Sequence, residues 1–259
     1  MNVQRVWVIA QNVFREVIRD RILYLIGFFA VVLIVISMLL PQISANTEDK
    51  ILLDVGMAGI TIAGLVTAVF VGTGLVNKEI EKRTVFVLIA KPISRVEFIV
   101  GKHLGLTAVL AVLITAMTLI YFGVLSIHQV SYPAGSLAIA SFYTLLELSL
   151  VTAIAILFGV FTSSLLSTML TFAMYIMGHL SPDLVELAKL AENPSLEQLT
   201  ENIYLVLPDL SRLNLRNAAV YGSELMPEPT ELLSSGVYAI AYIVLLLTIA
   251  NFIFSRRQF

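Results

Sequence analysis

The chain has 259 residues, of which 58% are hydrophobic and 13% charged, and its formal net charge is −2. Its mean hydropathy of +0.93 excludes an ordinary soluble domain, in which about a quarter of the residues are charged, and indicates an integral membrane protein. Balanced charge argues against nucleic acid as a partner, because phosphate binding needs a basic surface. The absence of cysteine excludes disulfides, thiolate nucleophiles and cysteine metal sites.

Residues 1–21 are predicted to form an amphipathic helix in the membrane interface. Apolar residues recur every three or four positions, as on one face of a helix. This set is Val3, Val6, Trp7, Ala10, Val13, Phe14, Val17 and Ile18. Trp and Arg are common at interfaces, which favours this interpretation over a solvent-facing helix that binds a partner. The stretch has no apolar core, so it is not a secretory signal, and we interpret the following run as a retained span.

Six segments are long and apolar enough to form transmembrane helices. They are residues 22–40, 55–76, 104–127, 137–161, 165–180 and 237–254. Only Thr162, Ser163 and Ser164 separate the fourth from the fifth, which predicts a tight helical hairpin. At the start of the third span, Gly101 and Gly105 share one helix face at a spacing that allows close approach of another helix.

The distribution of Lys and Arg predicts the orientation of the chain. Of these residues, four lie in residues 1–21, six in residues 77–105 and two in residues 255–259, against four on the opposite side of a six-span arrangement. Cytoplasmic loops carry an excess of Lys and Arg. We therefore expect a multi-pass protein of the cell (inner or plasma) membrane with both termini in the cytoplasm.

Residues 181–235 are predicted to form a small helical cap on the exoplasmic side. Ser181, Pro182 and Asp183 are typical of a helix start, here for residues 184–191, and the spacing of Ser195 and Gln198 is that of a capping box. The segment is too small to bury much core alone, so we expect it to fold against the spans as part of a single domain, residues 1–259.

No catalytic or nucleotide-binding signature is present in the sequence. It lacks a phosphate-binding Gly-x4-Gly-Lys-Ser/Thr loop, a His-Glu-x-x-His zinc helix and a Gly-x-Ser-x-Gly nucleophile elbow. We therefore expect a protein that is not an enzyme, does not hydrolyse ATP itself and binds no metal or cofactor.

One acid, Glu147, lies near the middle of the fourth span, where a charge costs about 2.5–3.5 kcal/mol on insertion scales. It is either a residue of a translocation path, as substrate contact or proton relay, or a neutral or hydrogen-bonded residue that holds helices together. We favour the second interpretation. Its candidate partners are Ser141, Thr144, Ser149, Thr152 and a partner subunit. His179 is expected to pack at the interface.

The connection between the second and third spans has more features than an orienting loop requires. Residues 78–86 are predicted to form a short charged helix along the membrane surface, which Pro92 ends. Ser94 and Glu97 then have capping-box spacing before the third span. A merely topogenic loop explains the charge, but not the Glu-x-Glu, Pro-x-Ser-Arg and Gly-Lys order.

This connection resembles the signature of ABC-2-type permeases, the membrane subunits of ATP-binding-cassette exporters. The matching residues are Glu79, Glu81, Lys82, Arg83, Thr84, Leu88, Lys91, Pro92, Ser94, Arg95, Gly101 and Lys102. The broader family often has Gly before the Thr, and Arg83 at that position is similar to the narrower branch linked to multicopper-enzyme maturation.

The resemblance implies an all-α protein in which residues 77–103 form a cytoplasmic coupling segment, with a coupling helix seated in a separate ATPase subunit. The residues that it implies for coupling are Lys78, Glu79, Glu81, Lys82, Arg83, Thr84, Pro92, Ser94 and Arg95. It also implies a second permease, as homodimer or heterodimer, and two ATPase subunits that bind ATP and Mg²⁺.

Two alternatives remain open at this stage. One is a proton- or ion-coupled secondary carrier with Glu147 as relay, for which internal repeats and broken helices are typical, and neither is evident. The other is a non-transporting membrane assembly factor. The transported substrate does not follow from the sequence.

Overall fold

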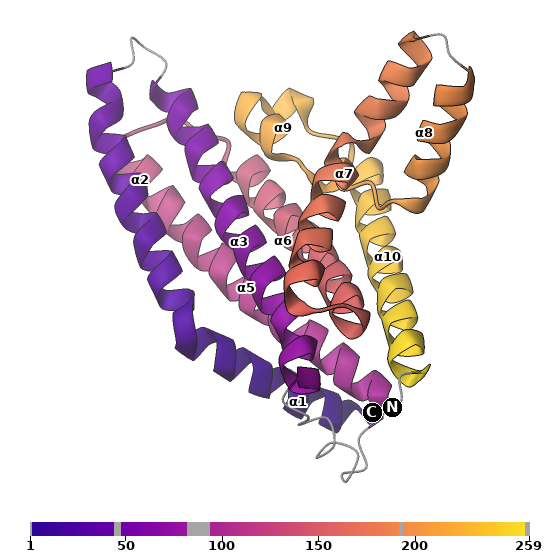
Figure 1. Ribbon diagram of the computed structural model, residues 1–259. Coiled ribbons are helices and arrows are strands. Elements are labelled where there is room, and N and C mark those ends of the chain that lie inside the picture. Colours follow the sequence, from indigo (N-terminus) through magenta and orange to yellow (C-terminus); the bar gives the residue numbers. More distant parts are fainter. Residues whose placement is uncertain (1, 44–47, 82–93, 192–193, 257–259) are drawn as a thin grey trace.

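The computed structural model describes residues 2–43, 48–81, 94–191 and 194–256, and all regular structure within these ranges is helical (Figure 1). The helices are α1 (Val3–Val17), α2 (Leu23–Ile43), α3 (Glu48–Glu81), α5 (Arg95–Ile127), α6 (Ala134–Phe161), α7 (Ser164–Leu190), α8 (Pro194–Val206), α9 (Arg216–Tyr221) and α10 (Pro229–Arg256). A π-helical turn, Ile18–Ile22, joins α1 to α2, and the 3-10 turns Ser211–Leu213 and Ser223–Leu225 flank α9. The predicted all-helical class is confirmed.

Within the described ranges, five helices are long and apolar enough to cross a membrane. Their candidate spans are Leu23–Leu40, Asp49–Asn77, Arg95–Ile127, Ala134–Phe161 and Pro229–Arg256. The predicted span of residues 165–180 lies in α7, which is helical but is not among the five. Its apolar stretch is short and interrupted by Ser, Thr and His, and the helix continues into a charged end.

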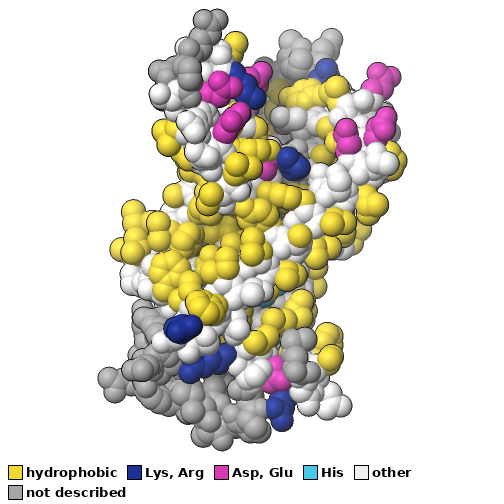
Figure 2. Space-filling model, turned by 90° about the vertical axis from the view of Figure 1, so that its right-hand side faces the viewer, with side chains coloured by type: hydrophobic (Ala, Val, Ile, Leu, Met, Phe, Trp, Pro, Cys, Tyr) yellow, Lys and Arg dark blue, Asp and Glu magenta, His cyan; other side chains and the backbone are white. Residues whose placement is uncertain are grey.

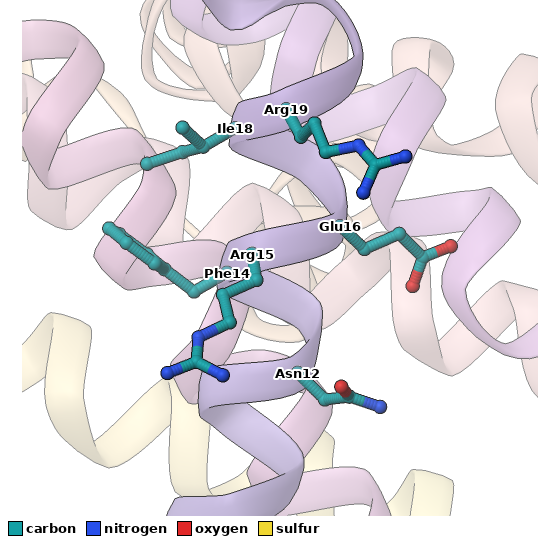
Figure 3. Close-up of a pocket in the computed structure, with 6 residues that line it drawn as sticks. All are labelled: Asn12, Phe14, Arg15, Glu16, Ile18 and Arg19. Carbon is teal, nitrogen blue, oxygen red and sulfur yellow. The ribbon is translucent and has the colours of Figure 1, made fainter.

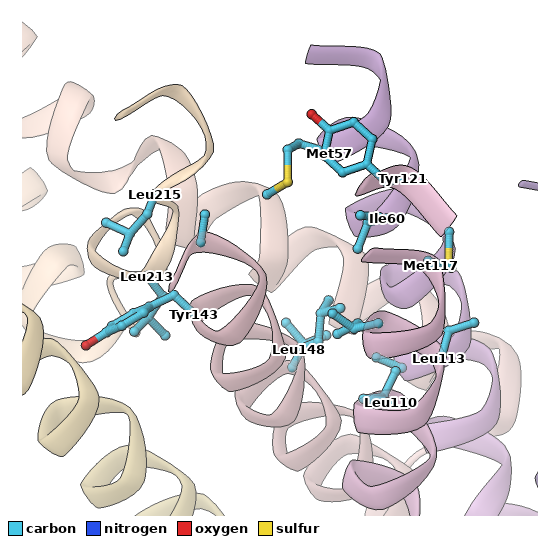
Figure 4. Packing of buried hydrophobic residues seen from close by; sticks show 14 of the residues in the cluster. Met57, Ile60, Leu110, Leu113, Met117, Tyr121, Tyr143, Leu148, Leu213 and Leu215 are labelled. Atoms are coloured by element: carbon cyan, nitrogen blue, oxygen red, sulfur yellow. The ribbon is translucent and has the colours of Figure 1, made fainter. Parts of the chain in front are cut away.

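Helix α6 forms the centre of the bundle. In its most apolar stretch of 18 residues 72% of the residues are buried, against 17% and 28% in the corresponding stretches of α2 and α10, so α6 is surrounded by protein and the other two lie at the periphery. This agrees with its apolar composition on all sides. Around it α3, α5, α7 and α10 pack, and Figure 4 shows core side chains of α3 and α5 beside Leu148 of α6.

The outer surface is apolar over its middle. On the face shown in Figure 2, hydrophobic side chains cover the central part and charged side chains gather toward the two ends. Large exposed hydrophobic residues include Phe28 on α2, Phe70 on α3 and Val244 on α10. Such a band between charged ends is what a surrounding bilayer requires.

The predicted amphipathic helix at the amino terminus is confirmed as α1, and only part of its apolar face is covered by the rest of the chain. Val6, Ala10 and Val13 are buried, whereas Val3 and Trp7 are exposed, Trp7 by 68%. The buried stripe packs on the first half of α5. In Figure 1, α1 crosses the lower end of the bundle, and α2 turns upward after the π-helical turn.

Helix α3 is longer than the predicted second span, residues 55–76. It runs without a break from Glu48 to Glu81, so Lys78, Glu79 and Glu81 extend the helix of that span. The surface helix predicted for residues 78–86 therefore does not begin as a separate helix, because residues 78–81 continue α3. No Gly or Pro interrupts residues 75–81, and nothing local ends the helix. The remainder of the predicted surface helix lies outside the described residues.

The predicted helix start at Ser181 and Pro182 is wrong, because α7 continues through Pro182 to Leu190. Proline has no backbone N–H, so it leaves the carbonyl oxygen of Gly178, four residues earlier, without its helical donor. The backbone N of Leu210 donates to this oxygen at 3.0 Å. A distant segment thus compensates for the proline. The tight hairpin before α7 is confirmed, since α6 ends at Phe161 and α7 begins at Ser164.

Within the predicted cap, the helix expected near Ser195 is confirmed as α8, which begins one residue earlier at Pro194. The segment after α8 is held by Asp209. Its carboxylate accepts hydrogen bonds from Tyr204 Oη at 2.9 Å, Ser211 Oγ at 2.6 Å and Arg212 Nε at 3.0 Å. Burial alone would raise the pKa of Asp209, but these hydrogen bonds hold it below its usual value.

Replacing Asp209 by asparagine should lower the thermal stability of the purified chain at pH 7 by about 1 kcal/mol, because hydrogen bonds to a charged group are lost beside a half-exposed Arg212. The folded pKa is depressed, so this stabilisation is fully present above the unfolded pKa of about 3.9 and is lost as the pH falls through the folded pKa. The difference in thermal stability between the Asp209→Asn variant and the parent chain should therefore become smaller as the pH falls.

Glu201→Gln is the control, since Glu201 and Lys189 are both exposed. An equal loss of thermal stability in that variant would contradict the prediction.

Candidate functional site

The beginning of α5 is the part of the predicted coupling segment that the structure describes best. Ser94 Oγ accepts a hydrogen bond from the backbone N of Glu97 at 3.2 Å, and Glu97 Oε2 accepts from the backbone N of Ser94 at 3.0 Å. The predicted capping box is therefore confirmed. It satisfies two helix-end donors and fixes where the chain enters α5.

Glu97 also holds the amino terminus of α1. Its Oε1 accepts a hydrogen bond from the backbone N of Asn2 at 2.6 Å, and its Oε2 lies 3.9 Å from Arg5 Nη1. Glu97 is 3% exposed, whereas the Arg5 side chain is 42% exposed, so the ion pair lies at the surface of the bundle. The sequence suggested only the capping role, because Asn2 and Glu97 are 95 residues apart and no local pattern pairs them.

Arg95 makes a comparable contact with the carboxyl end of α10. Its Nη1 donates to the carbonyl oxygen of Phe254 at 2.6 Å, and its guanidinium lies 5.7 Å from the centre of the Phe254 ring. Phe98 stacks on the same ring with centroids 5.9 Å apart. We call this set of residues the α5 corner. It consists of Asn2, Arg5, Ser94, Arg95, Glu97, Phe98 and Phe254.

The α5 corner lies at the end of the bundle where both chain termini are found (Figure 1). Two of the residues implied for coupling, Ser94 and Arg95, belong to it. Lys78, Glu79 and Glu81 form the last turns of α3. Lys82, Arg83, Thr84 and Pro92 lie outside the described residues. The structure thus brings together the start of α1, the start of α5 and the end of α10.

The predicted close approach at Gly101 and Gly105 is confirmed, and the partner is α1. A Cβ added to Gly101 would lie 2.8 Å from Ile9 Cβ. One added to Gly105 would lie 2.7 Å from the carbonyl oxygen of Ala10 and 2.7 Å from Val13 Cβ. Real Cβ atoms do not approach so closely, so the glycines allow α1 to lie directly on α5.

Glu147 faces α7 in the interior of the bundle. It is 0% exposed, and its Oε1 lies 3.3 Å from Nε2 of His179. The contact joins α6 to α7. Among the described residues, neither carboxylate oxygen accepts a well-aligned hydrogen bond. Tyr175, one turn before His179, interacts through its hydroxyl with both Glu147 and Arg216, which begins α9.

The four predicted partners of Glu147 on its own helix bond to other groups, so the prediction was wrong for them. Thr144 and Thr152 donate to carbonyl oxygens of their own helix, and so does Ser141. Ser149 contacts Thr107 of α5 at 3.1 Å. His179 was expected to pack at the interface, and its contact with Glu147, 3.3 Å from Nε2 to Oε1, was not predicted.

The contact between Glu147 and His179 brings two ionisable side chains together in the interior of the bundle. His179 Nδ1 lies 3.0 Å from the carbonyl oxygen of Tyr175, which can only accept, so Nδ1 bears a hydrogen. An attractive contact between Nε2 and Oε1 then requires one more proton, on the imidazole or on the carboxyl group. With that proton, the pair places no uncompensated charge in the interior.

The described residues offer no metal site, since no group of three His, Asp or Glu among them could hold an ion. A comparison with curated proteins found no significant match to the chain. A family model described as ABC-2 family transporter protein matches residues 7–259. The membrane component of such a transporter is a multi-pass permease that binds no cofactor, and the ATPase activity lies in a separate subunit. The match covers nearly the whole chain, which therefore belongs to the ABC-2 transporter family as its membrane permease component.

Proposed function

We propose that this permease exports its substrate and receives the work of ATP hydrolysis through residues 77–103. The separate ATPase subunit can bias a membrane assembly between two states only by contacts that differ between those states. Residues 77–103 carry six of the sixteen Lys and Arg residues of the chain, together with Glu79 and Glu81. This charge density supports a contact with a protein partner at this place.

The observation that carries the proposal is the geometry of the α5 corner. Arg95 ties the start of α5 to the end of α10, and Glu97 ties it to the start of α1. A displacement of the chain just before Ser94 would therefore be transmitted to three helices together. The short hydrogen bonds and the ring stacking of Phe98 make these helix ends a common rigid element.

The finer features of the assembly are part of the same proposal. We place both termini and residues 77–103 in the cytoplasm, because twelve Lys and Arg residues lie on that side and four on the other. Residues 165–180 of α7 serve as a sixth span, and residues 181–235 form the exoplasmic cap. Two permeases, identical or different, join two ATPase subunits. The branch linked to multicopper-enzyme maturation gains no support from the family match, so the substrate is left open.

Reversing the charge of Glu79 and Glu81 to lysine should uncouple ATP hydrolysis from transport. The two acids lie in the last turn of α3, so the change should leave insertion into the membrane intact. We expect the variant to lose stimulation of the ATPase subunit, and co-purification with it, by about tenfold or more, the effect of a coupling free energy of 1–3 kcal/mol. The measurement compares ATPase activity and substrate transport in reconstituted vesicles.

The matched control is the double variant Glu228→Lys and Glu231→Lys, which makes the same charge change before and at the start of α10, at the opposite end of the bundle. It should retain coupling. Unchanged coupling in the Glu79 and Glu81 variant, or an equal loss in the control, would refute the assignment of residues 77–103.

A further inference from the structure

Helix α7 carries an apolar stripe that no described part of the chain covers. Its exposed side chains recur at alternating spacings of four and three residues, as positions a and d of a heptad do. The a positions are Leu166, Ala173, Leu180 and Leu187, and the d positions are Met169, Ile176, Asp183 and Leu190. All of them are exposed, and the six large apolar side chains are between 46% and 75% exposed. The stripe therefore runs along almost the whole helix.

The stripe is longer than lipid can cover. From Leu166 to Leu190 the helix rises by about 36 Å, whereas the hydrocarbon core of a bilayer is about 30 Å thick. The last part of the stripe lies among charges, since Asp183 and Lys189 are exposed there. In Figure 1 this part of α7 extends, with α8 beside it, past the start of α10. In an isolated chain Leu187 and Leu190 therefore meet water, which favours a protein partner over lipid at this end.

The exposed faces of α1 and α2 differ from this stripe. The exposed apolar residues of α2 have a similar spacing, but all of them lie within the candidate span Leu23–Leu40, where lipid can cover them. On α1 a depression of about 700 Å³ is lined mainly by the polar side chains Asn12, Arg15, Glu16 and Arg19 (Figure 3). Of these three helices, α7 alone carries an apolar stripe into a charged segment beyond the membrane.

A second copy of the chain is the partner that fits the stripe. Two copies in one membrane have the same orientation, so a two-fold axis along the membrane normal places their α7 helices parallel to each other. Each a or d residue then faces its own counterpart, as in a parallel coiled coil. The six large side chains expose of the order of 600 Å², which is most of the roughly 800 Å² per partner that a stable interface buries.

Asp183 is the polar exception in the stripe. It occupies a d position, so the two-fold axis would bring the carboxylates of both copies close together. Like charges that face each other weaken a pairing, and one polar residue in such a seam fixes its register at a cost in stability. This position therefore predicts a substitution that strengthens the pairing, which a face covered by lipid or by an unrelated protein does not.

We propose that two identical permeases pair through α7, in a parallel helix pair that begins in the membrane and continues outside it to Leu190. The inference rests on the pairing of two permeases in the proposed function. It adds the helix that forms the interface and identifies the partner as a second copy. It does not depend on the coupling role of residues 77–103.

The chain has no cysteine, so single cysteines can be introduced without a background reaction. In vesicles that contain the full chain and no ATPase subunit, oxidation should link two copies through Ile176→Cys, Leu187→Cys or Leu190→Cys, because facing a and d positions bring Cβ atoms within disulfide reach. Lys189→Cys is the matched control, since it is exposed beside Leu190 but points away from the axis. Val35→Cys, exposed on α2, controls for random collision in the membrane.

A second measurement reports the strength of the pairing. Energy transfer between donor-labelled and acceptor-labelled chains is followed while the vesicles are diluted with lipid. Asp183→Leu should lower the protein-to-lipid ratio at half-maximal transfer by about tenfold, and Leu187→Asp should raise it by about as much. Lys189→Leu adds the same apolar side chain away from the axis and should leave the ratio unchanged. All the substituted side chains are exposed, so the packed interior of the chain is not disturbed.

Cross-linking through Leu187→Cys and Leu190→Cys, with little through the two controls, would support the proposal. Equal cross-linking of Leu190→Cys and Lys189→Cys would overturn it, and so would an Asp183→Leu variant that pairs no more strongly than the parent. Energy transfer without cross-links on α7 would also overturn it, but would leave two permeases paired through another face. A complete absence of energy transfer would overturn it and require a different permease as the partner. None of these outcomes bears on the coupling role of residues 77–103.

Discussion

Replacing Gly105 by leucine should separate α1 from α5 and lower the thermal stability of the purified chain by about 1–3 kcal/mol, the usual cost of overpacking. The new side chain would begin 2.7 Å from the Ala10 carbonyl oxygen and from Val13 Cβ, atoms that belong to the α1 backbone or lie next to it. Only a movement of the whole helix can make room. Intrinsic helix propensity acts in the opposite direction, because leucine favours the helical state over glycine by up to about 1 kcal/mol.

The opposing signs make this experiment informative, because a loss of stability must come from the helix contact. Gly123→Leu is the matched control in the same helix, since a Cβ there meets no atom within 4 Å. That variant should be neutral or slightly more stable. Equal stability of the two variants would show that α1 does not lie on α5 as closely as the structure has it.

Replacing His179 by leucine should destabilise the chain by about 3–5 kcal/mol, the cost of breaking a buried ion pair by removal of one partner. Glu147 is 0% exposed, the hydroxyl groups near it on α6 bond to carbonyl oxygens of their own helix, and the neutral hydroxyl of Tyr175 cannot replace a chargeable imidazole. The double variant Glu147→Leu and His179→Leu should recover most of the loss, because apolar side chains of similar size leave no uncompensated charge.

A double-mutant cycle on the thermal stability of the detergent-solubilised protein measures this coupling. His128→Leu is the control, since His128 is exposed after the end of α5. Additive effects of the two single changes would refute a coupled pair between α6 and α7. Transport by the double variant distinguishes the two roles of Glu147, namely holding helices together and lining a translocation path. If it transports normally, the pair holds helices together, whereas a stable but inactive double variant places Glu147 on the translocation path.

Features with a local cause were predicted correctly. The capping box of Ser94 and Glu97 depends on residues three positions apart, and the hairpin before α7 on the polar residues that interrupt an apolar run. The position of α1 as an amphipathic helix follows from its 3.6-residue period. The coupling residues implied by resemblance stay a prediction, since four of the nine, Lys82, Arg83, Thr84 and Pro92, lie outside the described residues and the positions of the other five do not show a contact with an ATPase subunit.

Features that depend on a distant segment were missed or predicted wrongly. Pro182 is typical of a helix start, and α7 continues through it only because the backbone N of Leu210 reaches the Gly178 oxygen. The ionisable partner of Glu147 is on another helix, and its own helix suggested only hydroxyl groups. The end of the span near Lys78 was predicted from a change in polarity, but α3 continues because hydrogen bonding along a helix does not depend on polarity.

The sequence by itself determined that this is a helical membrane protein with an amphipathic amino-terminal helix and a charged connection of the ABC-2 type, because composition, periodicity and motif spacing act within a few turns of one chain segment. The tertiary structure alone decided that Gly101 and Gly105 receive α1, that Glu97 and Arg95 hold the ends of α1 and α10, and that Glu147 meets His179. These contacts join residues far apart in sequence. Each helix face accepts several neighbours equally well in isolation, and only the simultaneous packing of all the helices selects one of them.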